Sequence, residues 1–85
     1  MKGNDMKRRM FDRVDALLAV ANAIDILCED NKLTHSDFAR KIGSHPSTVS
    51  MYTRQNTLPS IDVLMNISIK FNVSVDWVLG LSDEK

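Results

Sequence analysis

The stretch that decides the fold runs from residue 34 to residue 53 and reads THSDFARKIGSHPSTVSMYT. Thr34 and Asp37 have the spacing of a capping box, in which each side chain bonds the backbone N–H of the other at the start of a helix. Gly43 suits the left-handed conformation that ends a helix, and Pro46 suits the first position of the next one. The stretch therefore predicts a short helix, a glycine turn and a second short helix.

The flanking sequence also predicts helices. Downstream, Ser60 and Ser74 are suited to cap a fourth and a fifth helix, which end at Asn72 and Gly80. Upstream, no Pro or Gly interrupts residues 4–31, and apolar residues recur every three or four positions, as on one helix face. These residues are Met10, Val14, Leu17, Leu18, Ala21, Ile24, Leu27 and Cys28. This spacing predicts one long first helix or two shorter ones.

The whole pattern predicts an all-α domain of five helices, the first of them extended at its N-terminus. We expect residues 20–80 to form the domain, residues 1–19 a basic helical extension, and residues 81–85 a flexible tail. A chain of 85 residues leaves no room for a second domain. With 44% hydrophobic and 26% charged residues, the composition is that of a soluble globular domain rather than of a disordered chain.

The formal net charge of zero conceals alternating blocks of charge. Residues 1–13 hold five basic and two acidic side chains, a net charge of +3. Residues 14–33 hold one basic and four acidic side chains, a net charge of −3. Residues 34–58 hold three basic side chains and one acidic side chain, a net charge of +2. Residues 59–85 hold two basic and four acidic side chains, a net charge of −2. A polyanion is expected to meet the first and third blocks, although such blocks can also be no more than solvated faces.

Several functional classes are excluded or disfavoured by what the sequence lacks. No apolar run has the character of a signal peptide or of a membrane span, so we expect a cytoplasmic protein with no membrane partner. The single cysteine, Cys28, excludes an internal disulfide and is expected to be a buried apolar side chain. His35, His45 and Cys28 lack the spacing of metal ligands. With no catalytic or phosphate-binding motif, we expect neither an enzyme nor a metal or other cofactor.

Short segments between residues 33 and 80 carry a family pattern. They are Leu33-Thr34, Phe38-Ala39, Lys41-Ile42-Gly43, Ser47-Thr48-Val49-Ser50, Tyr52, Pro59-Ser60-Ile61 and the stretch from Val73 through Asp76-Trp77 to Gly80. In these segments the chain resembles the helix-turn-helix family of phage repressors and Cro proteins, also called the xenobiotic-response-element family. The resemblance covers about residues 20 to 80.

The resemblance implies a repressor-like fold that binds double-stranded DNA, with the helix from about 46 to 53 in the major groove. By position, the residues that would read bases are Pro46, Ser47, Ser50 and Met51. Those that would contact phosphates are His35, Ser36, Arg54, Gln55 and Asn56. Beyond the resemblance, Lys7, Arg8 and Arg9 of the basic extension are candidates for phosphate or minor-groove contacts.

The chain departs from the family pattern at two of these positions. His35 stands where the family commonly has Gln, and Gln55 stands where it commonly has Gly. The four base-reading positions also lack Arg, Lys, Asn and Gln, the residues that make strong bidentate contacts with bases. Direct readout of each half-site should therefore be weak. Specificity could still come from backbone amides, from the shape of the DNA, or from the basic N-terminal segment entering a groove as an arm.

These features predict a prokaryotic or phage transcriptional regulator that binds a pseudo-palindromic operator as a homodimer, with no small-molecule ligand. The candidate dimer or partner interface comprises Phe11, Leu18 and Trp77. The alternative is a helix-turn-helix module that binds protein, such as an antirepressor, an antitoxin or a partner of a larger regulator, because the zero net charge also allows it. The apolar residues of the extension could equally pack on their own domain.

Overall fold

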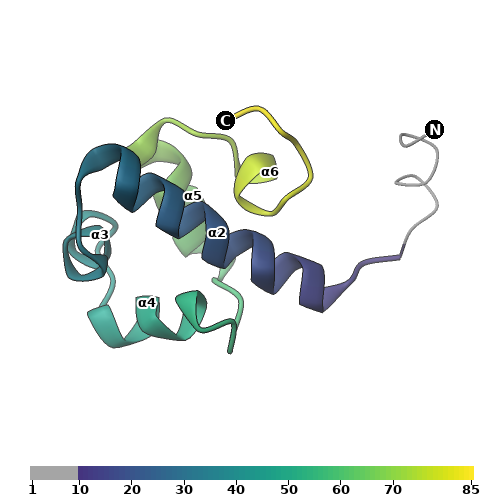
Figure 1. The fold of residues 1–85 in the computed structure, drawn as a ribbon, viewed down its shortest axis with the longest axis horizontal. Helices are drawn as coiled ribbons and strands as arrows, with labels where there is room; N and C mark the ends of the chain where they lie inside the picture. The colour runs from purple at the N-terminus through teal and green to yellow at the C-terminus, as the bar shows by residue number, and fades with distance from the viewer. Residues whose placement is uncertain (1–9) are drawn as a thin grey trace.

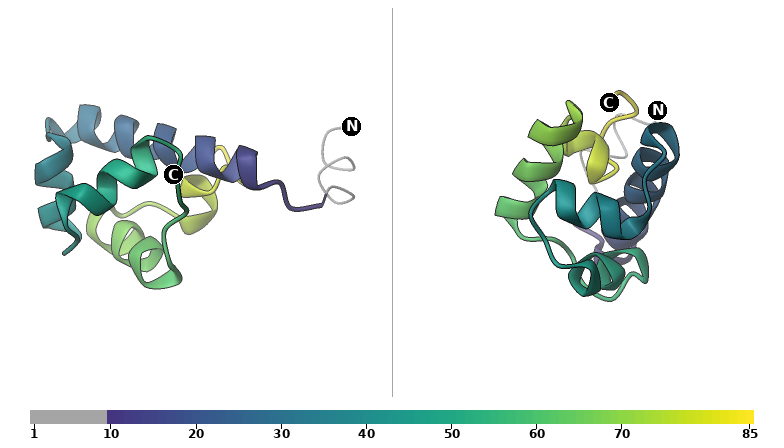
Figure 2. Two further views of the ribbon diagram at one scale, coloured as in Figure 1. Left: turned by 90° about the horizontal axis from the view of Figure 1, so that it is seen from below. Right: turned by 90° about the vertical axis from the view of Figure 1, so that its left-hand side faces the viewer.

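The computed structural model describes residues 10–85, and this part of the chain forms five α-helices and no strand. They are α2 (Arg13–Asn31), α3 (His35–Lys41), α4 (Pro46–Thr53), α5 (Ile61–Phe71) and α6 (Val75–Val78). The all-α prediction is confirmed. Viewed end-on, α2 and α5 lie on opposite sides of the bundle, and α4 lies along one edge between them (Figure 2). No helix within the described range has the length and hydropathy needed to cross a membrane.

The first helix is a single element of 19 residues. It begins at Arg13, because the Asp12 side chain accepts a hydrogen bond from the Val14 N–H at 3.0 Å and caps the helix. It ends at Asn31, because the next residue, Lys32, caps the helix with a left-handed φ of 57°. Met10 and Phe11 therefore precede the helix, and residues 1–9, with the basic residues Lys7, Arg8 and Arg9, lie outside the described range.

The local signals around the turn are confirmed. The Thr34 hydroxyl accepts from the Asp37 N–H at 3.0 Å, and the Asp37 carboxylate accepts from the Thr34 N–H at 3.1 Å. These bonds to Thr34, helped by the Arg40 guanidinium, hold the pKa of Asp37 below its ordinary value. Gly43 takes a φ of 73° between α3 and α4, and Pro46 occupies the first turn of α4. The turn thus fixes the angle between these two helices.

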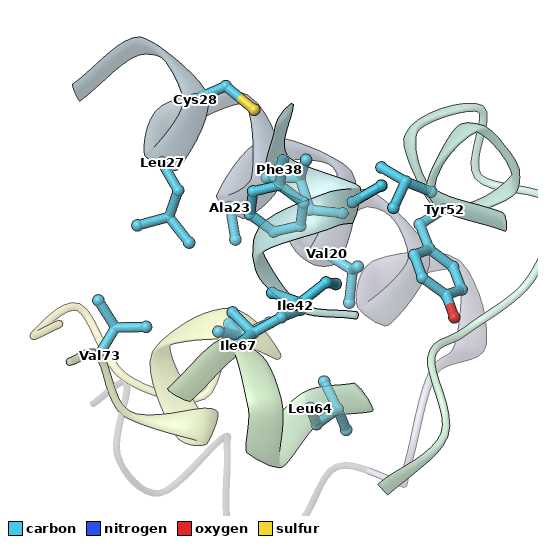
Figure 3. Packing of buried hydrophobic residues seen from close by; sticks show 14 residues of the cluster. Val20, Ala23, Leu27, Cys28, Phe38, Ile42, Tyr52, Leu64, Ile67 and Val73 are labelled. Atoms are coloured by element: carbon cyan, nitrogen blue, oxygen red, sulfur yellow. The ribbon is translucent and has the colours of Figure 1, made fainter. Parts of the chain in front are cut away.

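The core is built from all five helices and holds no buried charged or polar residue among those described. Figure 3 shows side chains from α2, α3, α4 and α5 converging on it. Phe38, Ile24 and Ile67 are fully buried. The rings of Phe38 and Phe71 stack with centroids 5.0 Å apart, which ties α3 to α5.

The apolar face of α2 is only partly covered. Its buried residues begin at Ala16 and are Ala16, Val20, Ala21, Ala23, Ile24, Leu27 and Cys28. Val14 and Leu18 remain exposed, as do Met10 and Phe11 before the helix. The reason is visible in Figure 1, where the N-terminal turns of α2 project beyond α4. The periodicity thus identifies an apolar face but not which part of it is covered.

Residues 81–85, which the sequence predicts as a flexible tail, make specific contacts. The Ser74 N–H donates to the Lys85 carbonyl oxygen at 2.7 Å. The Lys85 ammonium lies 2.9 Å from the Asp30 carboxylate and 5.5 Å from the centroid of the Trp77 ring. The segment is thereby folded back over α6 toward the C-terminal end of α2.

Candidate nucleic-acid interface

The helix α4 presents two different faces. Val49 and Tyr52 are buried and anchor it to the core. On the opposite face the structure brings together the four predicted base-reading residues, of which Ser50 is half-buried and the others are exposed: Pro46, Ser47, Ser50 and Met51. Residues three and four positions apart share a helix face, so these side chains form one outward stripe. We call these four residues the α4 stripe.

The start of α4 is capped by His45, a residue that the sequence did not single out for the interface. Its Nδ1 accepts from the Ser47 N–H at 3.2 Å and lies 2.8 Å from the Ser47 hydroxyl oxygen. An imidazole whose Nδ1 accepts a bond from a backbone N–H carries its proton on Nε2 when it is neutral. The signal that could have identified His45 is its place directly before Pro46, the first residue of the helix.

The loop after α4 is bonded back to the α4 stripe. The Arg54 Nε–H donates to the Ser50 hydroxyl at 3.2 Å, and the Asn56 amide donates to the Met51 sulfur at 3.8 Å. Gln55 between them has a φ of 62°, a left-handed conformation that glycine adopts more readily. Three predicted phosphate contacts thus lie directly beside the predicted base-reading residues.

The start of α3 supplies the other predicted phosphate contacts. His35 and Ser36 are its first two residues, and both are exposed. The His35 Nε2 lies 3.1 Å from the Asp25 carboxylate on α2, so in the free protein this ring turns toward its own chain. Arg40 pairs with Asp37, and the Lys41 ammonium lies 5.9 Å from the centroid of the Phe71 ring.

Taken together, α3, α4 and their loops carry an uncharged stripe and three basic side chains, of which Arg54 is bonded directly to the stripe. Residues 34–58 carry three basic groups and one acidic group, a net +2. All three basic side chains of this block, Arg40, Lys41 and Arg54, are exposed. Such a surface attracts a polyanion, while the stripe itself offers hydroxyl and apolar groups.

The groups that could carry other chemistry are buried or dispersed. Burial, with smaller effects from Asp25 and Asp37, raises the pKa of the Cys28 thiol, which stays protonated at neutral pH. Cys28 is thus buried, as predicted. Burial also raises the pKa of the Tyr52 phenol. Within residues 10–85, no three His, Cys, Asp or Glu side chains cluster closely enough to hold a metal ion.

The structure places the three candidate interface residues in different surroundings. Phe11 and Leu18 are exposed at the N-terminal end of α2. Trp77 is half-buried, packs against the core and carries Lys85 over its ring. Phe11 and Leu18 are therefore available to a partner, whereas much of Trp77 is already in contact with its own chain.

A comparison with curated proteins finds a relative that is named as a transcriptional regulator. A Bacillus subtilis (strain 168) protein named "Uncharacterized HTH-type transcriptional regulator YobD" is 37% identical over 54 residues, which are 64% of this chain and 48% of that protein. The chain thus spans about half the length of this curated relative. No solved structure matches it.

The family comparison covers most of the folded part. The family described as Helix-turn-helix matches residues 24–78, from the middle of α2 to the end of α6. The match supports the prediction of a non-enzymatic protein, because a helix-turn-helix is a unit for binding DNA. The matched region includes α3, the Gly43 turn and α4, and it covers more than half of the sequence. The chain therefore belongs to the helix-turn-helix family.

Proposed function

We propose that this protein is a DNA-binding transcriptional regulator that places α4 in the major groove of double-stranded DNA. The observation that carries this proposal is the α4 stripe, which faces outward while Val49 and Tyr52 hold the helix to the core. In a helix-turn-helix unit the second helix enters the groove and the first crosses the DNA backbone. Here α4 and α3 take these two roles.

The contacts follow from the side chains at each position. Ser47 and Ser50 exchange hydrogen bonds with base edges, and Met51 packs against a thymine methyl group. Arg54 donates one of its five N–H groups to the Ser50 hydroxyl. This hydrogen bond orients the guanidinium and leaves the other donors for a phosphate. His45 similarly caps α4 through Nδ1 and keeps Nε2–H available.

Further contacts would fix the position of the protein along the DNA. His35 and Ser36 at the start of α3, and Gln55 and Asn56 after α4, are placed for the flanking phosphates. Lys7, Arg8 and Arg9 would serve as an arm toward a phosphate or the minor groove. Such contacts supply affinity, while the α4 stripe and the shape of the DNA supply specificity.

A homodimer on a pseudo-palindromic operator completes the proposal. One α4 stripe without Arg, Lys, Asn or Gln discriminates weakly between bases, and two copies multiply that discrimination. Two half-sites would then lie about one helical turn apart, ~34–36 Å.

Selection of binding sites from random duplex DNA, repeated at two salt concentrations, tests this function. The expected product is an inverted repeat with half-site centres about 10–10.5 base pairs apart, bound less tightly at the higher salt concentration. Recovery of random sequences alone, with no preference at either salt concentration, would contradict it.

A protein-binding module is the second candidate function, favoured by the net charge of zero and by the exposed apolar residues Phe11, Val14 and Leu18. The two candidates differ in the residues that they need. A DNA reader loses binding when residues 47–54 are changed, whereas a protein binder loses it when residues 11–18 are changed.

A further inference from the structure

A side-chain contact joins α2 to the first residue of α3. The His35 Nε2 lies 3.1 Å from the Asp25 carboxylate, and the two side chains are 49% and 62% exposed. An exposed pair of this kind contributes little to the free energy of unfolding, because solvent screens it. Its effect is to orient the ring, whose other nitrogen, Nδ1, points in a different direction. No described residue forms a hydrogen bond with this Nδ1.

The chemistry of imidazole limits what this ring can bind. A neutral imidazole carries one proton, and beside a carboxylate acceptor that proton is on the nearer nitrogen, here Nε2. Nδ1 then presents a lone pair, which repels a phosphate oxygen. A protonated ring has an N–H on each nitrogen and can donate to two anions at once. His35 can therefore contact a phosphate while it keeps Asp25 only in its protonated form.

The side of the ring that faces α2 is acidic. Asp25 contacts the ring directly, and Glu29 lies one turn further along the same face of the helix. Cys28, in the same part of α2, is a neutral thiol at neutral pH because burial raises its pKa. Lys32, exposed in the turn between α2 and α3, is the basic residue nearest to His35 along the chain. A positive charge on the ring is thus met by carboxylates of α2.

The elements packed around α3 place no other carboxylate against the ring. The other ionisable side chains of α3, α4 and α5 are Asp37, Arg40, Lys41, Tyr52, Asp62 and Lys70. Asp37 and Arg40 pair with each other, and burial raises the pKa of Tyr52, which stays neutral. Lys41 and Lys70 lie near the C-terminal ends of their helices, whereas His35 begins α3. Among the described residues, Asp25 is therefore the group that holds the ring.

We propose that Asp25 is a positioning residue for DNA binding, and that the His35 ring it holds takes up a proton when a phosphate of double-stranded DNA docks at Nδ1. This inference rests on the proposed function and deepens it. The proton comes from the buffer and forms the Nδ1–H bond, and no other covalent bond changes. The imidazolium then lies between the Asp25 carboxylate and the phosphate and donates one hydrogen bond to each.

Proton uptake makes the DNA affinity depend on pH. The bound state holds more protons than the free state, so binding strengthens as the pH falls and weakens as it rises. An imidazole changes charge between about pH 5 and 8. Binding at pH 8 should be about tenfold weaker than at pH 6, since a charge-assisted hydrogen bond is replaced by none or by a neutral one. The plot of log affinity against log salt should also be steeper at pH 6, by about 0.9 for this one phosphate contact.

Isothermal titration calorimetry of the full chain tests the proposal. Duplex DNA that carries the selected site is titrated at pH 7 in two buffers of different ionisation enthalpy, which gives the number of protons taken up. The wild-type protein should take up about 0.5–1 proton per bound chain more than His35→Gln does. A glutamine amide has two N–H donors at every pH, so this variant should bind with little dependence on pH. A duplex of random sequence should give the same uptake, because phosphate contacts do not depend on sequence.

Asp25→Asn separates positioning from a general effect of charge. The amide oxygen can still accept from the ring, but no negative charge stabilises the imidazolium, so the uptake should fall to about half or less. The matched control is Glu29→Gln, which removes a carboxylate from the same face of α2 and should keep the wild-type uptake. Both side chains are exposed, so circular dichroism should show both variants folded. Equal uptake in Asp25→Asn and wild type would overturn the proposal.

His45, the other imidazole of the interface, requires its own control. Its Nδ1 accepts from the Ser47 N–H, so protonation of that nitrogen would break the cap of α4. Asparagine also caps helices and does not titrate, so His45→Asn removes this effect. The uptake should persist in His45→Asn. If it is lost there and kept in His35→Gln, the proton belongs to His45 and the proposal is overturned.

The outcomes distinguish this inference from the proposed function. If the duplex binds equally well at pH 6 and pH 8 without proton uptake, the inference fails and DNA binding stands. If Asp25→Asn binds more tightly than Glu29→Gln at both pH values with unchanged uptake, Asp25 competes with the phosphate and the inference fails. If neither duplex binds at either pH, the proposed function and the inference both fail.

Discussion

Replacing Gly80 by alanine tests the close approach of the chain after α6 to α2. Gly80 has a φ of 82°, and an added Cβ would lie 2.8 Å from the Ala19 Cβ. The left-handed conformation costs an L-residue about 1–2 kcal/mol, of which about 0.4–1 kcal/mol is offset by the reduced freedom of the unfolded chain. Crowding against a packed helix adds about 1–3 kcal/mol. Gly80→Ala should therefore lower the free energy of unfolding by about 1–4.6 kcal/mol, with a central value of about 3 kcal/mol.

Gly43→Ala is the matched control, because Gly43 has a similar φ of 73° and open space where its Cβ would lie. It should cost only about 1 kcal/mol. Ala19→Gly removes the atom that crowds Gly80→Ala, so the double variant should be more stable than the sum of the two single variants predicts. Urea unfolding followed by Trp77 fluorescence measures all four. Equal losses at Gly80 and Gly43, with additive effects in the double variant, would refute the reasoning.

Three further predictions concern α3 and the loop after α4. Gln55→Gly should raise the free energy of unfolding by about 0.5–1 kcal/mol in urea denaturation, because Gln55 has a φ of 62°; a loss of stability would show that its side chain matters more than its backbone. The pKa of Asp37 is lowered in the fold, so the ionised carboxylate contributes its full stabilisation at pH values above 3.8, the ordinary pKa of the group. This contribution is lost as the pH falls through the lowered pKa. Asp37→Asn should therefore be less stable than wild type at neutral pH, with a difference that shrinks in acid; a constant difference in denaturation at several pH values would contradict this. Arg54→Ala should weaken binding to all duplexes and reduce the salt slope by about 0.9 per phosphate contact, while Lys70→Ala on α5 should not; equal slopes in anisotropy titrations would remove Arg54 from the interface.

The helices and their ends were largely predictable because their signals are local. The Thr34 and Asp37 capping box, the left-handed Gly43 and the caps at Ser60 and Ser74 depend on residues within a few positions of each other. Asn72 likewise ends α5 in the left-handed conformation, as predicted. Each of these features depends on the backbone conformation of one residue or on a hydrogen bond between residues two or three positions apart.

Features that depend on distant packing were not predictable in the same way. The periodicity of α2 includes Val14 and Leu18 in the apolar face, but only the fold decides that no element covers them. The pairing of His35 with Asp25 and the contact between Gly80 and Ala19 likewise join residues of different segments.

The candidate site was predictable as a stripe but not in its hydrogen bonds. Spacing alone places Ser47 and Met51 on one face of α4. That His45 caps this helix while contacting the Ser47 hydroxyl, and that Ser50 orients Arg54, depends on side-chain rotamers that a sequence pattern does not specify.

A base-substitution scan of the selected site with Met51→Gln tests most directly whether α4 reads bases. Met51 and Met65 are exposed to similar extents, 39% and 48%, on α4 and α5, so Met65→Gln is the matched control. Gln can bond adenine through two hydrogen bonds. If α4 lies in the groove, Met51→Gln should change the preferred base at one position of each half-site and keep the salt slope, while Met65→Gln should change neither. A preference that is the same in wild type and in both variants would contradict it.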